Sequence, residues 1–230
     1  LSSWGMSDRG DDATINRAGA GGEVLPIIGF YLQTAVGGIP LSRAFWARFA
    51  AIDNVVAIKV APFNRYRTLD VCFGIATAQA EDRITLYTGN DDHIVADLVT
   101  PMVVRTGNRE VTLRFQGGLL GHWSVWTRPA VTLHRQCQAT AGATPELLRL
   151  AVAVTDANAA FFDAANGFAG CIAGLHEVLR RQGLLEGIWC LDEHETLSPG
   201  QAAEIDRVYQ AYPELNDDVF VREHLDIWLS

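Results

Sequence analysis

The chain has 230 residues, of which 49% are hydrophobic and 20% charged, so it can bury a sizeable core and is not a disordered chain. Its formal net charge of −9 argues against nucleic acid or an anionic membrane surface as the main partner. No apolar run reaches the about 18 residues of a membrane span, and the first residues lack a signal-peptide core. The cytoplasm is therefore the expected location.

The basic residues and the cysteines each show a distinctive pattern in the sequence. There are 17 arginines and a single lysine, Lys59. Four cysteines are widely spaced without a C-x-x-C pair, so neither a zinc ribbon nor a redox pair is indicated. In a core-rich chain of this size we expect them to be reduced and mostly buried, at Cys72, Cys137, Cys171 and Cys190.

The N-terminal third begins with a polar, glycine-rich stretch over residues 1–24. Its glycines are not followed by a helix-opening pattern, so no phosphate loop is predicted. Residues 25–33 form an apolar run that is typical of a buried strand, and residues 34–40 form a loop. Ser42 is a plausible N-cap for a helix that ends near Ile52.

Strands and helices then alternate. Apolar runs predict strands at residues 55–61 and 83–87, separated by a helix over residues 66–80. A short helix is predicted over residues 93–102. Residues 103–115 alternate around Gly107-Asn108, which predicts a β-hairpin.

The last part of the chain is predicted to be mostly helical. Residues 117–126 form a fourth strand-like apolar run, and helices follow from Pro129 onward. Thr144-Pro145 is a cap followed by a first-turn proline, and Ser198-Pro199 repeats this device. Alternating strands and helices imply parallel strands joined by right-handed crossovers. Four such units fit either half of an eight-unit barrel or a small open sheet, and the periodicity does not decide between them.

Lys59 is the first candidate for chemistry because it lies inside an apolar strand. Burial disfavours the charged ammonium and lowers a lysine pKa, and a neutral amine is what attack on a ketone requires. At the end of a barrel strand such an amine would point into the active-site mouth. The alternative is a lysine that snorkels from a strand end or pairs with a carboxylate.

Three further candidates accompany Lys59. Tyr31 lies 28 residues earlier, near the end of the preceding strand. A phenol that reached the same mouth would relay protons, and the alternative is a core tyrosine whose hydroxyl is satisfied by hydrogen bonds. Asp91, Asp92 and His93 follow the third strand and either bind a divalent metal or cap the next helix. Gly117, Gly118 and Gly121 flank the fourth strand, where glycines let a substrate approach the backbone.

The succession of these motifs resembles the dihydrodipicolinate synthase / N-acetylneuraminate lyase family over about residues 23–130. In that family a P-x-x-x-Y-N-x-P strand precedes an N-[IV]-x-G-[IV]-K strand, and a G-x-D strand end follows. The matching segments here are Leu25-Pro26-Ile27-Ile28-Gly29-Phe30-Tyr31, Asp53-Asn54-Val55-Val56-Ala57-Ile58-Lys59 and Leu86-Tyr87-Thr88-Gly89-Asn90-Asp91-Asp92.

The resemblance implies an α/β chain that forms the second half of a (β/α)₈ TIM barrel, about strands 5–8, with a helical C-terminal extension. The half-barrel would cover residues 1–140, with a hairpin insertion near 103–115, and the extension residues 141–230. Residues 1–4 would end the fourth strand, and the first half of the barrel would be absent from this chain. We expect such a half-barrel to assemble, as a homo-oligomer or with a partner, or to be catalytically silent.

The resemblance also implies a site and a reaction. Lys59 would form an imine with a 2-oxo acid such as pyruvate, or with a sugar-acid derivative, and Tyr31 would relay protons. Gly89 and a strand containing Gly121, Trp123 and Ser124 would line the pocket. The expected activity is that of a class I aldolase-type lyase, or a related synthase or dehydratase, without a cofactor or metal.

Departures from the family pattern leave other functions open. Leu32 and Thr34 replace the asparagine and proline that follow the tyrosine, and Val36 stands where dihydrodipicolinate synthases carry an arginine. This argues against dihydrodipicolinate synthesis. A non-catalytic barrel relative that serves as a binding or structural subunit is the main alternative, and a metal-dependent barrel enzyme is a third.

Overall fold

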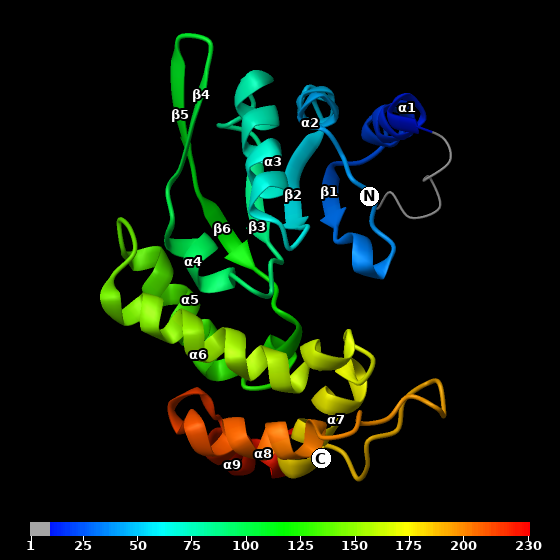
Figure 1. Ribbon diagram of the computed structural model, residues 1–230, viewed down its shortest axis with the longest axis vertical. Helices are drawn as coiled ribbons and strands as arrows, with labels where there is room; N and C mark the ends of the chain where they lie inside the picture. Colours follow the sequence, from blue (N-terminus) through cyan, green and yellow to red (C-terminus); the bar gives the residue numbers. More distant parts are fainter. Residues whose placement is uncertain (1–9) are drawn as a thin grey trace. The chain divides into compact units, whose positions relative to one another are not determined.

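The computed structural model describes residues 10–230 (Figure 1). The chain divides into two compact units, one that runs to Leu119 and includes residues 140–143, and one made of residues 120–139 and 144–230. The division lies earlier than the one predicted after residue 140, because helix α5 (Thr127–Ala139) belongs to the second unit. The prediction for residues 1–4 lies outside the described residues.

The first unit is a mixed α/β structure built on a four-stranded parallel sheet (Figure 1). Its strands lie in the order in which they follow one another along the chain: β1 (Ile27–Leu32), β2 (Val55–Ala61), β3 (Thr85–Thr88) and β6 (Phe115–Gly118). The accompanying helices are α1 (Gly10–Gly22), α2 (Arg43–Ala50), α3 (Arg65–Thr77) and α4 (Ile94–Val99). The predicted α/β class and parallel pairing are confirmed.

Local sequence signals explain where these helices begin. The Ser42 hydroxyl accepts a hydrogen bond from the backbone N–H of Phe45, at 3.1 Å, so the predicted N-cap of α2 is confirmed. Asn64 caps α3 in the same way, through the backbone N–H of Arg67. The polar stretch near the N-terminus contains helix α1, for which we made no prediction.

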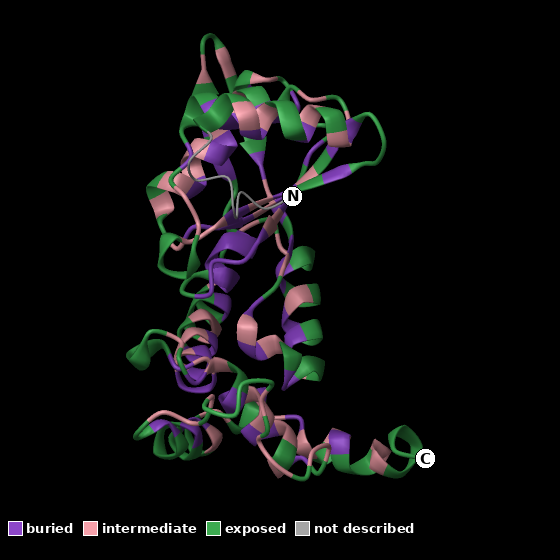
Figure 2. Cartoon of the chain, turned by 90° about the vertical axis from the view of Figure 1, so that its right-hand side faces the viewer, coloured by how far each residue is buried: buried purple, intermediate pink, exposed green. Residues whose placement is uncertain are grey.

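Helices cover one face of the sheet. Tyr31 of β1 packs against Trp46 of α2 with ring centroids 5.0 Å apart, and both side chains are almost fully buried. Gly29 lets Phe49 approach β1, since a Cβ there would lie 2.7 Å from the Phe49 ring. Helices α2 and α3 lie side by side over this face, and the buried residues gather along the strands and the facing sides of the helices (Figure 2).

A buried polar network fixes the carboxyl-end loops of the sheet. Asp97 of α4 is fully buried and accepts hydrogen bonds from the Thr88 hydroxyl, at 2.6 Å, and the Asn90 side-chain amide, at 2.9 Å. Its other oxygen pairs with Arg65 at the start of α3. Asn90 also donates to the hydroxyl of Thr68. One carboxylate therefore ties the end of β3 to α3 and α4.

The predicted hairpin is confirmed as strands β4 (Met102–Thr106) and β5 (Arg109–Leu113), which pair antiparallel. Gly107 has a φ of 57°, the left-handed conformation that a tight hairpin turn requires. The hairpin packs against α3, where the guanidinium of Arg109 donates to the carbonyl of Ala76.

The second unit is helical, as predicted. Its helices are α5 (Thr127–Ala139), α6 (Pro145–Phe161), α7 (Cys171–Arg181), α8 (Gln201–Ala211) and α9 (Asp218–Trp228). Thr144 caps α6 as predicted. Ser198-Pro199 does not start α8, which begins two residues later behind Gly200; the Ser198 hydroxyl instead donates to Asp163, at 2.5 Å.

The strand predicted over residues 117–126 is wrong beyond Gly118. β6 covers Phe115–Gly118, and residues Gly121–Ser124 form a 3₁₀ turn, η2. Tertiary contacts hold this turn: Gly121 lies against the ring of Phe162, and the Asn158 side chain accepts the backbone N–H of His122. An apolar run alone cannot distinguish such a buried turn from a strand.

The four cysteines are free thiols, as predicted. Burial raises the pKa of Cys72 to about 12 and that of Cys137 to about 11, so these two thiols are unreactive at neutral pH. Cys171 and Cys190 are only partly buried. Within residues 10–230, none of the helices is long and apolar enough to cross a membrane.

Replacing Asp97 with alanine tests the buried network. We expect Asp97→Ala to lower the free energy of unfolding by about 3 kcal/mol, since it leaves the donors of Thr88, Asn90 and Arg65 without their acceptor. Urea denaturation measures the loss, and the exposed Asp82→Ala serves as control. A loss below about 0.5 kcal/mol, the range of ordinary surface substitutions, would contradict this role.

Candidate functional site

Four residues form a row across the sheet on the face opposite helices α2 and α3. Phe30 of β1 pairs with Lys59 of β2, Lys59 pairs with Tyr87 of β3, and Tyr87 pairs with Gly117 of β6. Neighbouring strands lie about 4.8 Å apart, and paired residues of parallel strands point to the same face. Lys59 therefore stands between an aromatic ring on one side and a phenol on the other.

The surroundings of Lys59 act on its pKa in opposite directions. Its Nζ lies 4.5 Å from the centroid of the Phe30 ring, and the side chain is half-buried. Burial lowers the pKa of Lys59 below its ordinary value, while the negative charge of Asp91 raises it and offsets part of that effect. The expected lowering of this pKa is thus present, with desolvation as its main cause.

Two glycines make room for the row. A Cβ on Gly89 would lie 2.8 Å from Cε of Lys59, so this position accepts glycine alone without displacing the lysine. A Cβ on Gly117 would lie 2.6 Å from the ring of Tyr87. The Tyr87 hydroxyl donates a hydrogen bond to the carbonyl of Gly118, at 2.9 Å. Gly89 therefore lies beside Lys59, and its role in lining a substrate pocket stays a prediction.

Tyr31 does not join this row. It pairs with Val60 and points to the helix-covered face, where it is 1% exposed. Its hydroxyl donates to the carbonyl of Leu41, at 3.3 Å, and accepts from the N–H of the same residue, at 3.1 Å. Burial raises its pKa. The expectation that Tyr31 and Lys59 reach the same mouth is wrong for this chain, and Tyr31 anchors the loop before α2.

A β-bulge explains why Tyr31 faces away. Ile27 pairs with Val55, but Ile28 pairs with Ala57, so Val56 is an extra residue on β2. Without the bulge, the pairing of Ile27 with Val55 would continue to Tyr31 and Lys59. Because side chains alternate between faces, the extra residue turns Lys59 to the face opposite Ile27 and Tyr31 and brings it beside Phe30.

The other three residues predicted to line the pocket do not lie in the same unit as Lys59. Gly121, Trp123 and Ser124 lie in the second unit on the turn η2, where the Ser124 hydroxyl donates to the carbonyl of Gly121. Lys59 and Gly89 lie in the first unit. A substrate-binding role for these three residues stays a prediction.

The acidic loop after β3 forms part of the protein frame. Asn90 lies in the Asp97 network, Asp91 is buried and Asp92 is exposed. Across residues 10–230 we found no group of three or more histidine, cysteine or acidic side chains arranged to hold a metal ion. The metal-dependent alternative thus gains no support from the described residues.

Sequence reasoning missed Phe30 and Tyr87 as neighbours of Lys59. Tyr87 lies 28 residues after Lys59, the same spacing by which Tyr31 precedes it. Spacing alone therefore gave two equivalent tyrosines, and the register of the sheet selects Tyr87. A scan against protein-family models and a search of curated proteins found no match to this chain, so the site rests on its own geometry.

The pKa of Lys59 can be measured directly because the chain has one lysine. Reductive methylation with ¹³C-formaldehyde labels only Lys59 and the chain's α-amino group. We expect the lysine signal in NMR spectra to titrate below the ordinary value of about 10.4, because burial disfavours the charged amine. Asp91→Asn should lower this pKa further, since it removes the charge that raises it.

Asp92→Asn is the matched control for that titration, because Asp92 is the exposed carboxylate next in the chain. It should leave the lysine signal unchanged. A Lys59 pKa at or above the ordinary value would contradict the half-buried position of the amine.

Proposed function

We propose that the protein is an imine-forming lyase or aldolase that acts on a 2-oxo acid such as pyruvate or a sugar-acid derivative. One observation carries the proposal: the only lysine stands half-buried in the middle of a parallel sheet, and burial lowers its pKa. A neutral amine at Lys59 attacks the keto carbon, and the resulting carbinolamine loses water to give the imine. The resemblance to pyruvate-dependent aldolases supports the choice of substrate class.

Tyr87 is the proton donor in this scheme. Carbinolamine formation needs a proton on the former carbonyl oxygen, and loss of water needs a second one. Tyr87 pairs with Lys59 on the same face, and its hydroxyl is held by the Gly118 carbonyl. Phe30, on the other side of Lys59, has no proton to give. Tyr87 thus takes the role that the resemblance assigned to Tyr31.

The sheet fits a segment of a (β/α)₈ barrel. Its four strands are parallel and follow chain order, and the helices α2 and α3 cover one face while the Lys59 row occupies the other. In such barrels the reactive side chains point inward near the carboxyl ends of the strands, and Lys59 lies in the second half of β2. Assembly with further strands, from another copy or another segment, would enclose the row.

Borohydride trapping tests the proposed chemistry. Incubation of the folded protein with pyruvate and borohydride should add one reduced pyruvate unit to Lys59, identified by peptide mass analysis. Lys59→Arg keeps the charge but cannot form an imine, so it should give no adduct at this peptide. A wild-type protein that acquires no adduct on Lys59, or reacts only at its α-amino group, would leave the non-catalytic binding role as the better account.

A pair of tyrosine variants tests the assignment of Tyr87. Tyr87→Phe should slow formation of the pyruvate adduct by about 10²-fold or more, since it removes the proton donor and keeps the ring. Tyr31→Phe should leave the rate nearly unchanged and lower the free energy of unfolding by about 1–3 kcal/mol, because the buried N–H of Leu41 loses its acceptor. The reverse pattern of rates would restore Tyr31 as the relay and refute the assignment.

A further inference from the structure

A second region with the character of a binding site lies in the helical unit, between α5 and α9. A groove of about 550 Å³ is lined there by apolar and aromatic side chains from α5, α9 and the end of α7. We call it the α5–α9 groove; the residues that matter here are Arg128, Val131, Arg135, Leu184, Phe220 and Trp228.

Two arginines give this groove a positive edge. Arg128 and Arg135 are seven residues apart on α5, so they lie two turns apart on the same side of the helix, about 10 Å along its axis. Neither guanidinium forms an ion pair with a carboxylate in residues 10–230. In contrast, Arg181 and Arg207 of the same unit are both paired. Arg149 and Arg222 of the same unit likewise form no ion pair among the described residues, so Arg128 and Arg135 are distinguished by their shared position along the groove.

The one carboxylate in the groove is already satisfied. Asp217 is buried, and its two oxygens accept the backbone N–H of Arg128, at 3.1 Å, and the side-chain amide of Gln182, at 2.8 Å. It therefore positions the start of α5 and leaves the guanidinium of Arg128 available. That guanidinium lies 4.4 Å from the centroid of the Phe220 ring, which holds it over the aromatic wall.

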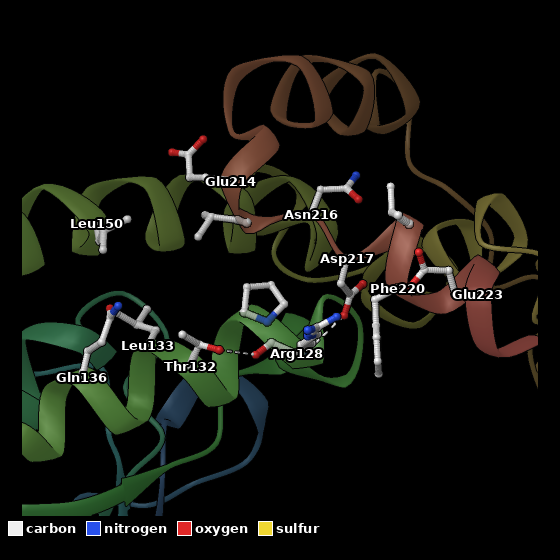
Figure 3. Close-up of a pocket in the computed structure, with 13 residues that line it drawn as sticks. Arg128, Thr132, Leu133, Gln136, Leu150, Glu214, Asn216, Asp217, Phe220 and Glu223 are labelled. Carbon is white, nitrogen blue, oxygen red and sulfur yellow. Dashed lines mark hydrogen bonds between the residues drawn. The ribbon is translucent and has the colours of Figure 1, made fainter.

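A neighbouring pocket of about 630 Å³, drawn in Figure 3, differs from the groove in the charged residues that line it. It shares Arg128, Asp217 and Phe220 with the groove, but it also carries Glu214 and Glu223, whose carboxylates disfavour an anion. Arg135 lines only the α5–α9 groove. The groove therefore has two arginines and one carboxylate, whereas the neighbouring pocket has one arginine and three carboxylates.

The apolar wall of the groove is aromatic and partly exposed. Phe220 and Trp228 both flank His224 on α9, with ring centroids 4.3 Å and 5.4 Å from the imidazole. Trp228 is 47% exposed and Val131 on α5 is 44% exposed. Such a surface gains free energy when it is covered by an apolar group of matching shape.

We propose that the α5–α9 groove binds a small amphipathic carboxylate, with the carboxylate between Arg128 and Arg135 and an aromatic or alkyl body against Phe220 and Trp228. Guanidinium groups are the preferred protein partners of carboxylates, and the apolar wall supplies the remaining affinity. The groove lies wholly within the second unit, so this site is independent of Lys59.

Calorimetric titration with naphthalene-2-carboxylate tests the proposal on the full chain. The wild-type protein should bind one molecule, and the neutral analogue 2-naphthalenemethanol should bind at least tenfold more weakly. The double variant Arg128→Gln/Arg135→Gln should also lose at least tenfold in affinity. Arg149→Gln removes the same charge from an exposed position outside the groove and should leave binding unchanged.

A second variant keeps the test independent of any effect of the double substitution on folding. Val131→Glu places a carboxylate between the two arginines on the same side of α5 and should abolish binding by pairing with them. The proposal is overturned if the wild-type protein does not bind at millimolar concentrations. It is equally overturned if the neutral analogue binds as tightly as the carboxylate. The same holds if the arginine and glutamate variants bind as tightly as Arg149→Gln.

Discussion

The hydrogen-bonded register between β1 and β2 determines which side chains share the surroundings of Lys59. A single extra residue, Val56, shifts this register by one position after Ile27. As a result Lys59 lies on the face of Phe30, and Tyr31 lies on the opposite face, where Trp46 and Leu41 hold it. Because alternate residues of a strand point to opposite faces, the bulge exchanges a phenol for a phenyl ring at the candidate site.

The loop after β3 links the pKa of Lys59 to the buried polar network. Burial destabilises the charged amine, and Asp91 moderates that effect from the loop after β3. The same loop is fixed by Asn90, which Asp97 ties to α3 and α4 from the covered face of the sheet. One face of the sheet therefore provides the structural anchor, and the other carries Lys59 and Tyr87, which occupy the room that Gly89 and Gly117 leave.

Much of the fold followed from the sequence because local signals were strong. Period-two and continuous apolar runs located β1, β2 and the hairpin, and the caps Ser42 and Thr144 located two helix starts. Failures occurred where distant contacts override local preference. The turn at Gly121–Ser124 depends on packing against α6 and the residue that follows it, and Ser198 is drawn to Asp163 instead of capping α8.

Only the part of the candidate site that has a strong local signal was predicted from the sequence. Lys59 is evident from its uniqueness and its apolar surroundings, whereas Gly89 was expected only from the family resemblance. The proton relay could not be assigned from spacing, since Tyr31 and Tyr87 are equally distant from Lys59 along the chain. The choice depends on a bulge, and no residue pattern in β1 or β2 announces it. The α5–α9 groove was not foreseen, because it brings together helices far apart in the chain.

A crystal structure of the protein after reduction with pyruvate and borohydride would test the central claim most directly. The account predicts continuous density from Nζ of Lys59 into a reduced pyruvate unit, with the Tyr87 hydroxyl on the same face and Tyr31 still bonded to Leu41. Density for the adduct at another amine, or a Tyr31 hydroxyl that reaches the Lys59 adduct while Tyr87 lies on the far face, would contradict it.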